Sequence, residues 1–397
     1  MLNKTGIQEN LSLLSQPINL SILFLFSIPL ITFDSRIILG TYFVLLGIIF
    51  LLFSAQNSFV DLTIYNSLTW FLLLFWGIFQ VFNSIHFTDS IFHFMIMILA
   101  PFCIFMVFTN LKLTENYLKR MFHIFFISGM FLSLISIYVI IDSGFNFKLR
   151  LSSVWDHYNL FAAYIMIIFF FNLCFIVYSK KDSNRKFYIV SLIVNFMGLF
   201  LTQTRGVWIA TIIGLSIFIL RKPKYILPIG IVAILLLAAF SDVIMERAAT
   251  VINFKTDIST LGRVQAWLAS YLLIKENLLV GYGYDAFRDL MNSVIPVYFV
   301  VVTHSHNTYL LILLEFGLIG FILFFSFYFK ALYYSFKLRK NSEPIMFKYI
   351  YGLQLSFIAM IVAFIFEPYF TTLGAINYVL WILIALSYSL WYKQIKT

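Results

Sequence analysis

Two histidines lie close together in the stretch Thr303-His-Ser-His-Asn-Thr-Tyr309, just before a long apolar segment. Histidine is suited to proton transfer near neutral pH because its pKa lies close to that range. Positions i and i+2 do not have the spacing of metal ligands on a helix, and no carboxylate or third histidine stands nearby in the sequence. We therefore predict that His306 acts as a base and that no metal is bound. The alternative is a histidine that only caps the helix.

The apolar segment after His306 contains Gly317 and Gly320. In a continuous helix, at about 100° per residue, both glycines would lie on the face below His306. Small residues there let a second helix approach closely, which would support the histidine rigidly. Ordinary glycine packing is the alternative. Glu315 would lie on the opposite face, where it is expected to bond to another helix or to act as a proton-coupling acid.

Two arginines have the right chemistry for a phosphate group. Arg205 lies in a tight connection between two apolar runs, and Arg263 begins an amphipathic segment. The guanidinium group binds phosphate oxygens through two parallel hydrogen bonds. The alternatives are a snorkelling side chain that marks a helix end for Arg205 and a solvated helix face for Arg263.

A further polar group precedes another apolar run. Arg150 is followed by Trp155-Asp-His-Tyr-Asn159. We expect Arg150 and Asn159 to lie at the same membrane edge as the arginines above. The alternative is helix capping by Asp156 or Asn159.

The elements that position these residues are predicted from composition. Of the 397 residues, 62% are hydrophobic and 11% charged, whereas a soluble domain carries about 25% charged residues. This composition excludes an ordinary soluble enzyme. Twelve apolar runs are candidates for membrane-spanning helices. They lie at 18–33, 37–53, 67–85, 90–109, 121–141, 159–178, 187–203, 206–220, 225–240, 308–328, 347–366 and 372–391.

We therefore predict an all-α integral membrane protein with about 12 transmembrane helices in one polytopic domain, residues 1–397. If the N-terminus is cytoplasmic, 18 of the 27 basic residues fall in cytoplasmic segments. This bias follows the positive-inside rule and predicts that both termini are cytoplasmic. It also explains the net charge of +10 without a nucleic-acid partner.

Residues 241–306 form one large loop on the outward side. Its segment Leu261–Leu279 has helical periodicity, with an apolar face that includes Val264, Trp267 and Tyr271. This pattern is typical of a helix that lies in the membrane interface. Loops of this length usually carry function.

With these spans and this loop, the polar residues resemble the motifs of a known superfamily. His306-Asn307, nine residues and then Gly317-x-x-Gly320 resemble the signature of the O-antigen ligases, whose wider superfamily includes O-antigen and capsule polymerases. Asn307, Gly317 and Gly320 would support His306. By motif, the resemblance covers residues 145–330.

Three further motifs occur in the same order as in that superfamily. Thr204-Arg205-Gly206 resembles its first outward arginine, and Gly262-Arg263 with Gly281-Tyr-Gly283 resembles its second, in the large loop. Arg150 to Asn159 resembles an arginine and an asparagine before a mid-chain span. The first 140 residues contain no recognised motif.

The resemblance implies a metal-independent, inverting glycosyltransferase of the GT-C type. Its donor would be a glycan on undecaprenyl diphosphate, with no further cofactor. His306 would take the proton of the acceptor hydroxyl, Arg205 and Arg263 would hold the departing diphosphate, and Arg150 and Asn159 would help to place a substrate. The site would face the periplasm or the cell exterior from the inner membrane.

Two acceptors remain open within the superfamily. A ligase transfers the glycan to lipid A-core, whereas a polymerase transfers it to another lipid-linked repeat unit, and the histidine motif favours the ligase. Transfer to a protein is a further alternative. Outside the superfamily, the alternative is a lipid-linked glycan transporter. Transporters place charged groups near the membrane midplane and contain repeats, whereas here, apart from Glu315, the charges lie at the outer edge, and no repeat is found.

Overall fold

The computed structural model describes residues 67–111, 113–155, 157–179, 182–245, 258–295, 302, 304–370 and 375–396. All regular secondary structure in these residues is helical, which confirms the all-α class. The helices are α4 (Ser67–Asn83), α5 (Phe87–Phe94), a π-helix (Met95–Leu99), α6 (Ala100–Asn110), α7 (Glu115–Asp142), α8 (Tyr158–Tyr178), α9 (Arg185–Leu201), α10 (Arg205–Arg221), α11 (Ile226–Ala239), α13 (Ile258–Glu276), α14 (Ala286–Val294), α15 (Thr308–Asn341), α16 (Phe347–Ala363) and α17 (Ala375–Lys396).

Six helical segments in the described part are long and apolar enough to cross a membrane. They are Phe87–Asn110, Glu115–Asp142, Tyr158–Tyr178, Thr308–Leu338, Pro344–Ala363 and Ala375–Tyr392. A shorter apolar helix spans Leu68–Asn83. Helices α9, α10 and α11 match expected spans but have 17, 17 and 14 residues. The expected spans at 18–33 and 37–53 lie outside the described residues, so the count of twelve stays a prediction.

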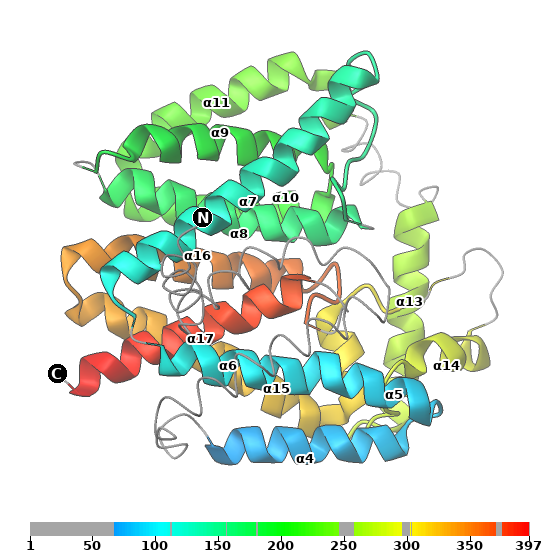
Figure 1. Ribbon diagram of the computed structural model, residues 1–397. Coiled ribbons are helices and arrows are strands. Elements are labelled where there is room, and N and C mark those ends of the chain that lie inside the picture. Colours follow the sequence, from blue (N-terminus) through cyan, green and yellow to red (C-terminus); the bar gives the residue numbers. More distant parts are fainter. Residues whose placement is uncertain are drawn as a thin grey trace, which may run out of the picture.

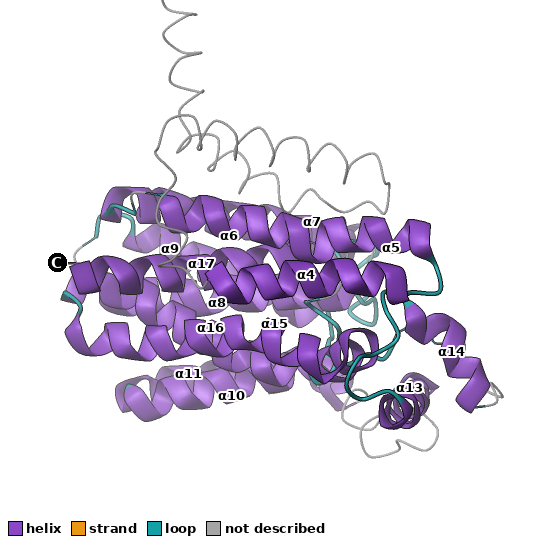
Figure 2. Ribbon diagram, turned by 90° about the horizontal axis from the view of Figure 1, so that it is seen from below, coloured by secondary structure: helices purple, strands orange, loops and turns teal. Residues whose placement is uncertain are grey.

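Most helices run side by side along one direction, whereas α13 stands across them at one end of the bundle (Figure 1). In Figure 2, turned by 90°, the bundle helices again lie in the plane and α13 is seen nearly end-on, with α14 beside it. A helix does occur where the periodicity of Leu261–Leu279 predicted one, with bounds Ile258–Glu276. Its apolar residues Val264, Leu268 and Tyr271 are exposed. The position of this helix in the membrane interface stays a prediction.

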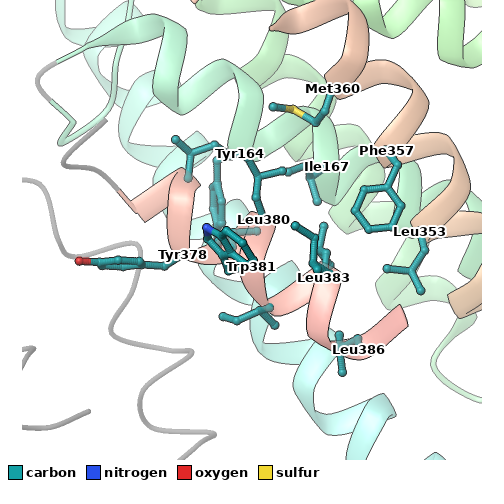
Figure 3. Packing of buried hydrophobic residues seen from close by; sticks show 14 of the residues in the cluster. Tyr164, Ile167, Leu353, Phe357, Met360, Tyr378, Leu380, Trp381, Leu383 and Leu386 are labelled. Atoms are coloured by element: carbon teal, nitrogen blue, oxygen red, sulfur yellow. The ribbon is translucent and has the colours of Figure 1, made fainter. Parts of the chain in front are cut away.

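The core of the bundle lies around α8, α16 and α17. Side chains from these three helices interdigitate in Figure 3, among them Ile167, Phe357 and Trp381. Nearly every side chain of α8 and α17 is buried, because each is surrounded by other helices. A helix that is apolar on all sides is stable in this setting.

The two ends of the bundle differ in the contacts that hold them together. At the end away from α13, Lys348 pairs with Glu115 at 2.9 Å and Lys119 with Asp182 at 2.8 Å. At the end near α13, successive loops bond to one another. There, the N–H of Leu151 donates to the carbonyl of Leu201 at 3.2 Å.

Helix α15 corrects one expectation. It begins at Thr308, so His306 lies before it, and its backbone leaves the helical conformation at Gly317 with φ 63° and ψ −173°. The prediction of one continuous helical face that holds His306, Gly317 and Gly320 is therefore wrong. Glycine is required at position 317 because other residues strongly disfavour this conformation.

Candidate active site

A buried carboxylate lies at the centre of the polar cluster. Glu367, in the loop between α16 and α17, is 2% exposed. Its Oε2 accepts a hydrogen bond from Nδ2 of Asn159 at 2.7 Å and lies 3.2 Å from Nδ1 of His306. Its Oε1 lies 3.3 Å from Nε2 of His304. Glu367 therefore joins the start of α8 to the segment before α15.

The surrounding backbone holds this loop in place. The hydroxyl of Thr308 donates to the carbonyl of Glu367 at 2.6 Å and accepts from the N–H of Tyr369 at 3.0 Å. The N–H of Thr308 donates to the carbonyl of Phe364 at 2.8 Å. Asn307 caps α15, since its Oδ1 accepts from the N–H groups of Tyr309 and Leu310. The first turn of α15 and the Glu367 loop thus form one unit.

His306 has a strained backbone and a partly accessible side chain. Its φ is 47°, in the left-handed region that non-glycine residues rarely occupy. Such strain persists only when the surroundings impose it, and it concentrates at functional sites. Its side chain is 23% exposed. Since Nδ1 faces the Glu367 carboxylate, the proton of the neutral imidazole belongs on Nδ1, which leaves Nε2 free to accept another.

The charges of the centre follow from burial and pairing. Burial alone would raise the pKa of Glu367, but the hydrogen bond and charge of His306, together with His304 and His157, lower this pKa to about 2. Burial lowers the pKa of His304 to about 4 and also lowers the pKa of His157. At neutral pH the centre therefore holds one carboxylate anion beside neutral His304 and His157.

Two predicted arginines lie close to this centre. The charges of Arg150 and Arg263 both act on His157, as do those of Glu367 and His306. The Arg150 guanidinium also stacks on the ring of Tyr158, 3.5 Å from its centroid. The same electrostatic neighbourhood thus contains residues of α8, α13 and the segment before α15.

Arg205 is the first residue of α10. A side chain at the next position, Gly206, would meet Phe366 at 2.5 Å, so the backbone of α10 lies directly against the residue before Glu367. Arg205 therefore begins its helix beside the Glu367 loop.

The remaining predicted residues have structural positions. Gly317 breaks α15, and a side chain at Gly320 would meet Phe316 at 2.3 Å and Trp76 of α4 at 3.1 Å. Asn159 does not cap α8. His157 does, with Nδ1 accepting from the N–H of Asn159 at 3.3 Å.

Glu367 does not follow from the sequence around the histidines. It lies 61 positions from His306 along the chain, so no carboxylate stands near the histidines in the sequence itself. An ionisable residue in or beside an apolar segment is a candidate functional residue. This rule singled out Glu315 and could also have identified Glu367.

Glu367, His304 and His306 are also residue types that bind metals. One ligand atom from each lies within 4.8 Å of the others. Two imidazoles and a carboxylate suit Zn²⁺ or Fe²⁺. In this conformation the same atoms face one another in the two histidine–glutamate contacts, which suits an acid–base pair equally well.

Comparison with protein families identifies a match largely in the second half of the chain. Residues 190–325 match the family model described as O-antigen ligase. The matched segment contains Arg205, Arg263, His306, Gly317 and Gly320. No curated protein matches the chain.

Proposed function

We propose that the chain is a member of the O-antigen ligase and polymerase superfamily, whose family model matches residues 190–325, and that it transfers a glycan from undecaprenyl diphosphate to a hydroxyl acceptor. The acceptor that we propose is lipid A-core, which makes the protein an O-antigen ligase. The observation that carries the proposal is the pairing of His306 with the buried carboxylate of Glu367 beside several arginines.

The proposed reaction is a single displacement. His306 Nε2 takes the proton of the acceptor hydroxyl while the oxygen of that hydroxyl attacks the anomeric carbon of the donor. The bond between that carbon and the diphosphate oxygen breaks, and the diphosphate leaves with the electron pair. Attack from the side opposite the leaving group inverts the anomeric centre. Glu367 stabilises the imidazolium that forms, as a buried carboxylate does in hydrolase triads.

The arginines supply the charge that the leaving group needs. A diphosphate that departs gains negative charge, and fixed cations stabilise it without reorganisation. We assign this role to Arg205 and Arg263, whose positions are supported by the contact of Gly206 with Phe366 and by the charge of Arg263 on His157. Arg150, which stacks on Tyr158, and Asn159, which is hydrogen-bonded to Glu367, would help to place the donor or the acceptor.

We further propose that the site faces the periplasm from the inner membrane. This orientation is supported by the basic residues at the opposite end of the bundle, among them Lys119 and Lys348. With the cations of Arg205 and Arg263 available for the diphosphate, the proposed mechanism needs no metal ion.

The test uses purified protein and a lipid-linked repeat-unit donor, with and without lipid A-core, in the presence and absence of EDTA. We expect transfer only when core is added, at a rate that EDTA does not change. A ladder of longer lipid-linked products without core would instead make the protein a polymerase. Loss of transfer in EDTA, restored by Zn²⁺ or another divalent ion, would contradict the metal-free mechanism. No transfer to either acceptor would contradict the proposed function.

A further inference from the structure

A second buried carboxylate lies in α15, away from the His306 centre. Glu315 is 3% exposed. Its Oε1 accepts a hydrogen bond from the N–H of Asp285 at 3.1 Å, and its Oε2 has no hydrogen-bond partner among the described residues. Burying a carboxyl group in an apolar helix costs free energy, so its presence indicates a specific role. The proposed reaction does not use it.

Glu315 lies at the break in α15. The conformation of Gly317 frees backbone groups that a continuous helix would pair internally. The turn Asn277–Asp285, here called the 277–285 turn, and α4 supply partners for them. The bonds run from Tyr282 N to Leu314 O at 2.9 Å, from Gly283 N to Glu315 O at 2.9 Å, from Leu318 N to Leu278 O at 2.8 Å, and from Trp76 Nε1 to Phe316 O at 2.8 Å.

The two backbones touch directly at this junction. A Cβ atom at Gly281 would lie 2.5 Å from the N atom of Gly317, and one at Gly317 would lie 2.3 Å from the carbonyl oxygen of Leu279. Both glycines have positive φ, 79° and 63°. The 277–285 turn is therefore seated in the break of α15 without intervening side chains.

Helix α4 holds the turn from another side. Nε2 of Gln80 donates to the carbonyl of Val280 at 2.6 Å, and Nδ2 of Asn83 donates to that of Gly281 at 3.0 Å. The hydroxyl of Ser84 donates to the carbonyl of Tyr284 at 2.9 Å. The carbonyls of residues 280, 281 and 284 are thus bound by side chains of α4 and of Ser84. The N–H groups of residues 282, 283 and 285 are bound by α15.

The turn connects α13, which carries Arg263, to α14 (Figure 1). Helix α13 packs through Ala269 and Leu273 in one apolar cluster with Leu311 and Leu314 of α15. The part of α15 before the break thus begins just after His306, ends at the 277–285 turn and packs against α13. When the turn is fixed on α15, α13 and its Arg263 are therefore held in a defined position relative to His306.

We propose that Glu315 is a positioning residue, which acts as a hydrogen-bond acceptor for the 277–285 turn and so sets the position of Arg263 relative to His306. This inference rests on the proposed function, because the effect is on the diphosphate site. It assigns Glu315 no role in proton transfer.

The test compares two replacements of similar size. Glu315→Gln keeps a side-chain acceptor for the N–H of Asp285, whereas Glu315→Met removes it. We expect Glu315→Gln to remain within about two-fold of the wild-type kcat/KM. We expect Glu315→Met to lose about 10- to 100-fold, since small displacements of a catalytic group have effects of that size. The loss should appear more in the KM for the lipid-linked donor than in kcat.

A double-mutant cycle with Arg263→Ala shows whether Glu315 acts through that arginine. We expect Glu315→Met to have little further effect once Arg263 is removed, because the two changes act on one interaction. Effects that multiply would overturn the proposal, as would equal losses in Glu315→Gln and Glu315→Met. If Glu315→Met does not fold, Asn83→Leu takes its place in the cycle, with the same expected coupling and the same contradicting result. Absence of transfer in the wild type would contradict the proposed function instead.

Discussion

At the scale of single residues, the chemistry depends on the pair that His306 forms with Glu367. The carboxylate is buried and its Oε2 is shared between His306 and Asn159. In such a pair the anion orients the imidazole and stabilises its protonated form. Removing the charge should therefore affect the chemical step rather than donor binding.

We predict that Glu367→Gln lowers kcat by about 10²- to 10⁴-fold and leaves the donor KM within a few-fold of wild type. The replacement keeps the volume of the side chain but not its charge. Steady-state kinetics of glycan transfer measure both constants. The matched control is Glu343→Gln, an exposed position at the opposite end of the bundle, which should behave as wild type. Unchanged kcat in Glu367→Gln would contradict the pair.

The depressed pKa values also predict how stability depends on pH. His304, with a pKa of about 4, and Glu367, with a pKa of about 2, both bind protons less readily in the folded protein than at their ordinary values of 6.5 and 4.5. Between pH 6.5 and 4 for His304, and between pH 4.5 and 2 for Glu367, the unfolded chain binds more protons than the folded protein. The free energy of unfolding therefore falls as the pH falls from 6.5. We predict that the thermal midpoint in detergent decreases over this interval and that His304→Gln flattens the slope between pH 6.5 and 4. An unchanged slope would exclude His304 as a source of the pH dependence of stability.

The residues of the site differ in how far the sequence predicts them. His306, Arg205 and Arg263 stand out because charged or titratable groups are rare in so apolar a chain. The partners of His306 could not be assigned in the same way, since Glu367 meets it only through the folding of α16 back onto α15. No local pattern encodes a contact between positions so far apart.

At the scale of elements, the break in α15 decides how α13 and the 277–285 turn are attached to the bundle. The residues on either side of Gly317 are apolar, so hydrophobic periodicity continues through the break and predicts one straight helix. The true conformation depends on the 277–285 turn, which binds the freed backbone groups from outside. Helices occur at the expected apolar runs within the described residues, whereas this junction was not predictable.

We predict that Gly281→Ala destabilises the protein, because the new methyl group meets backbone atoms of α15 and the residue has φ 79°. Left-handed backbone and a rigid clash together cost on the order of 1–3 kcal/mol or more. The midpoint of thermal unfolding in detergent, detected by size-exclusion chromatography, measures the effect. Gly230→Ala in α11 is the matched control, since a Cβ atom there meets nothing within 4 Å. Equal midpoints for the two variants would contradict the described junction.

At the scale of the whole molecule, the proposed function requires that the two ends of the bundle face opposite sides of the membrane. Asn292 in α14 lies at the end with the candidate site, and Glu343 lies at the basic end, and both are exposed. We predict that, in a variant without Cys103 and Cys174, Asn292→Cys reacts with an impermeant thiol reagent added outside whole cells. Glu343→Cys should react only after the membrane is opened. The reverse pattern would contradict the proposed orientation.

The role of His306 as the base is tested by the rate of glycan transfer by His306→Ala, measured with purified, folded protein and a lipid-linked donor. We predict a loss of at least about 10²-fold in kcat, because general base catalysis contributes on that order. The exposed histidine His86, paired with Asp289 outside the centre, provides the control, and His86→Ala should transfer at the wild-type rate. Transfer by His306→Ala at the rate of His86→Ala would contradict the account.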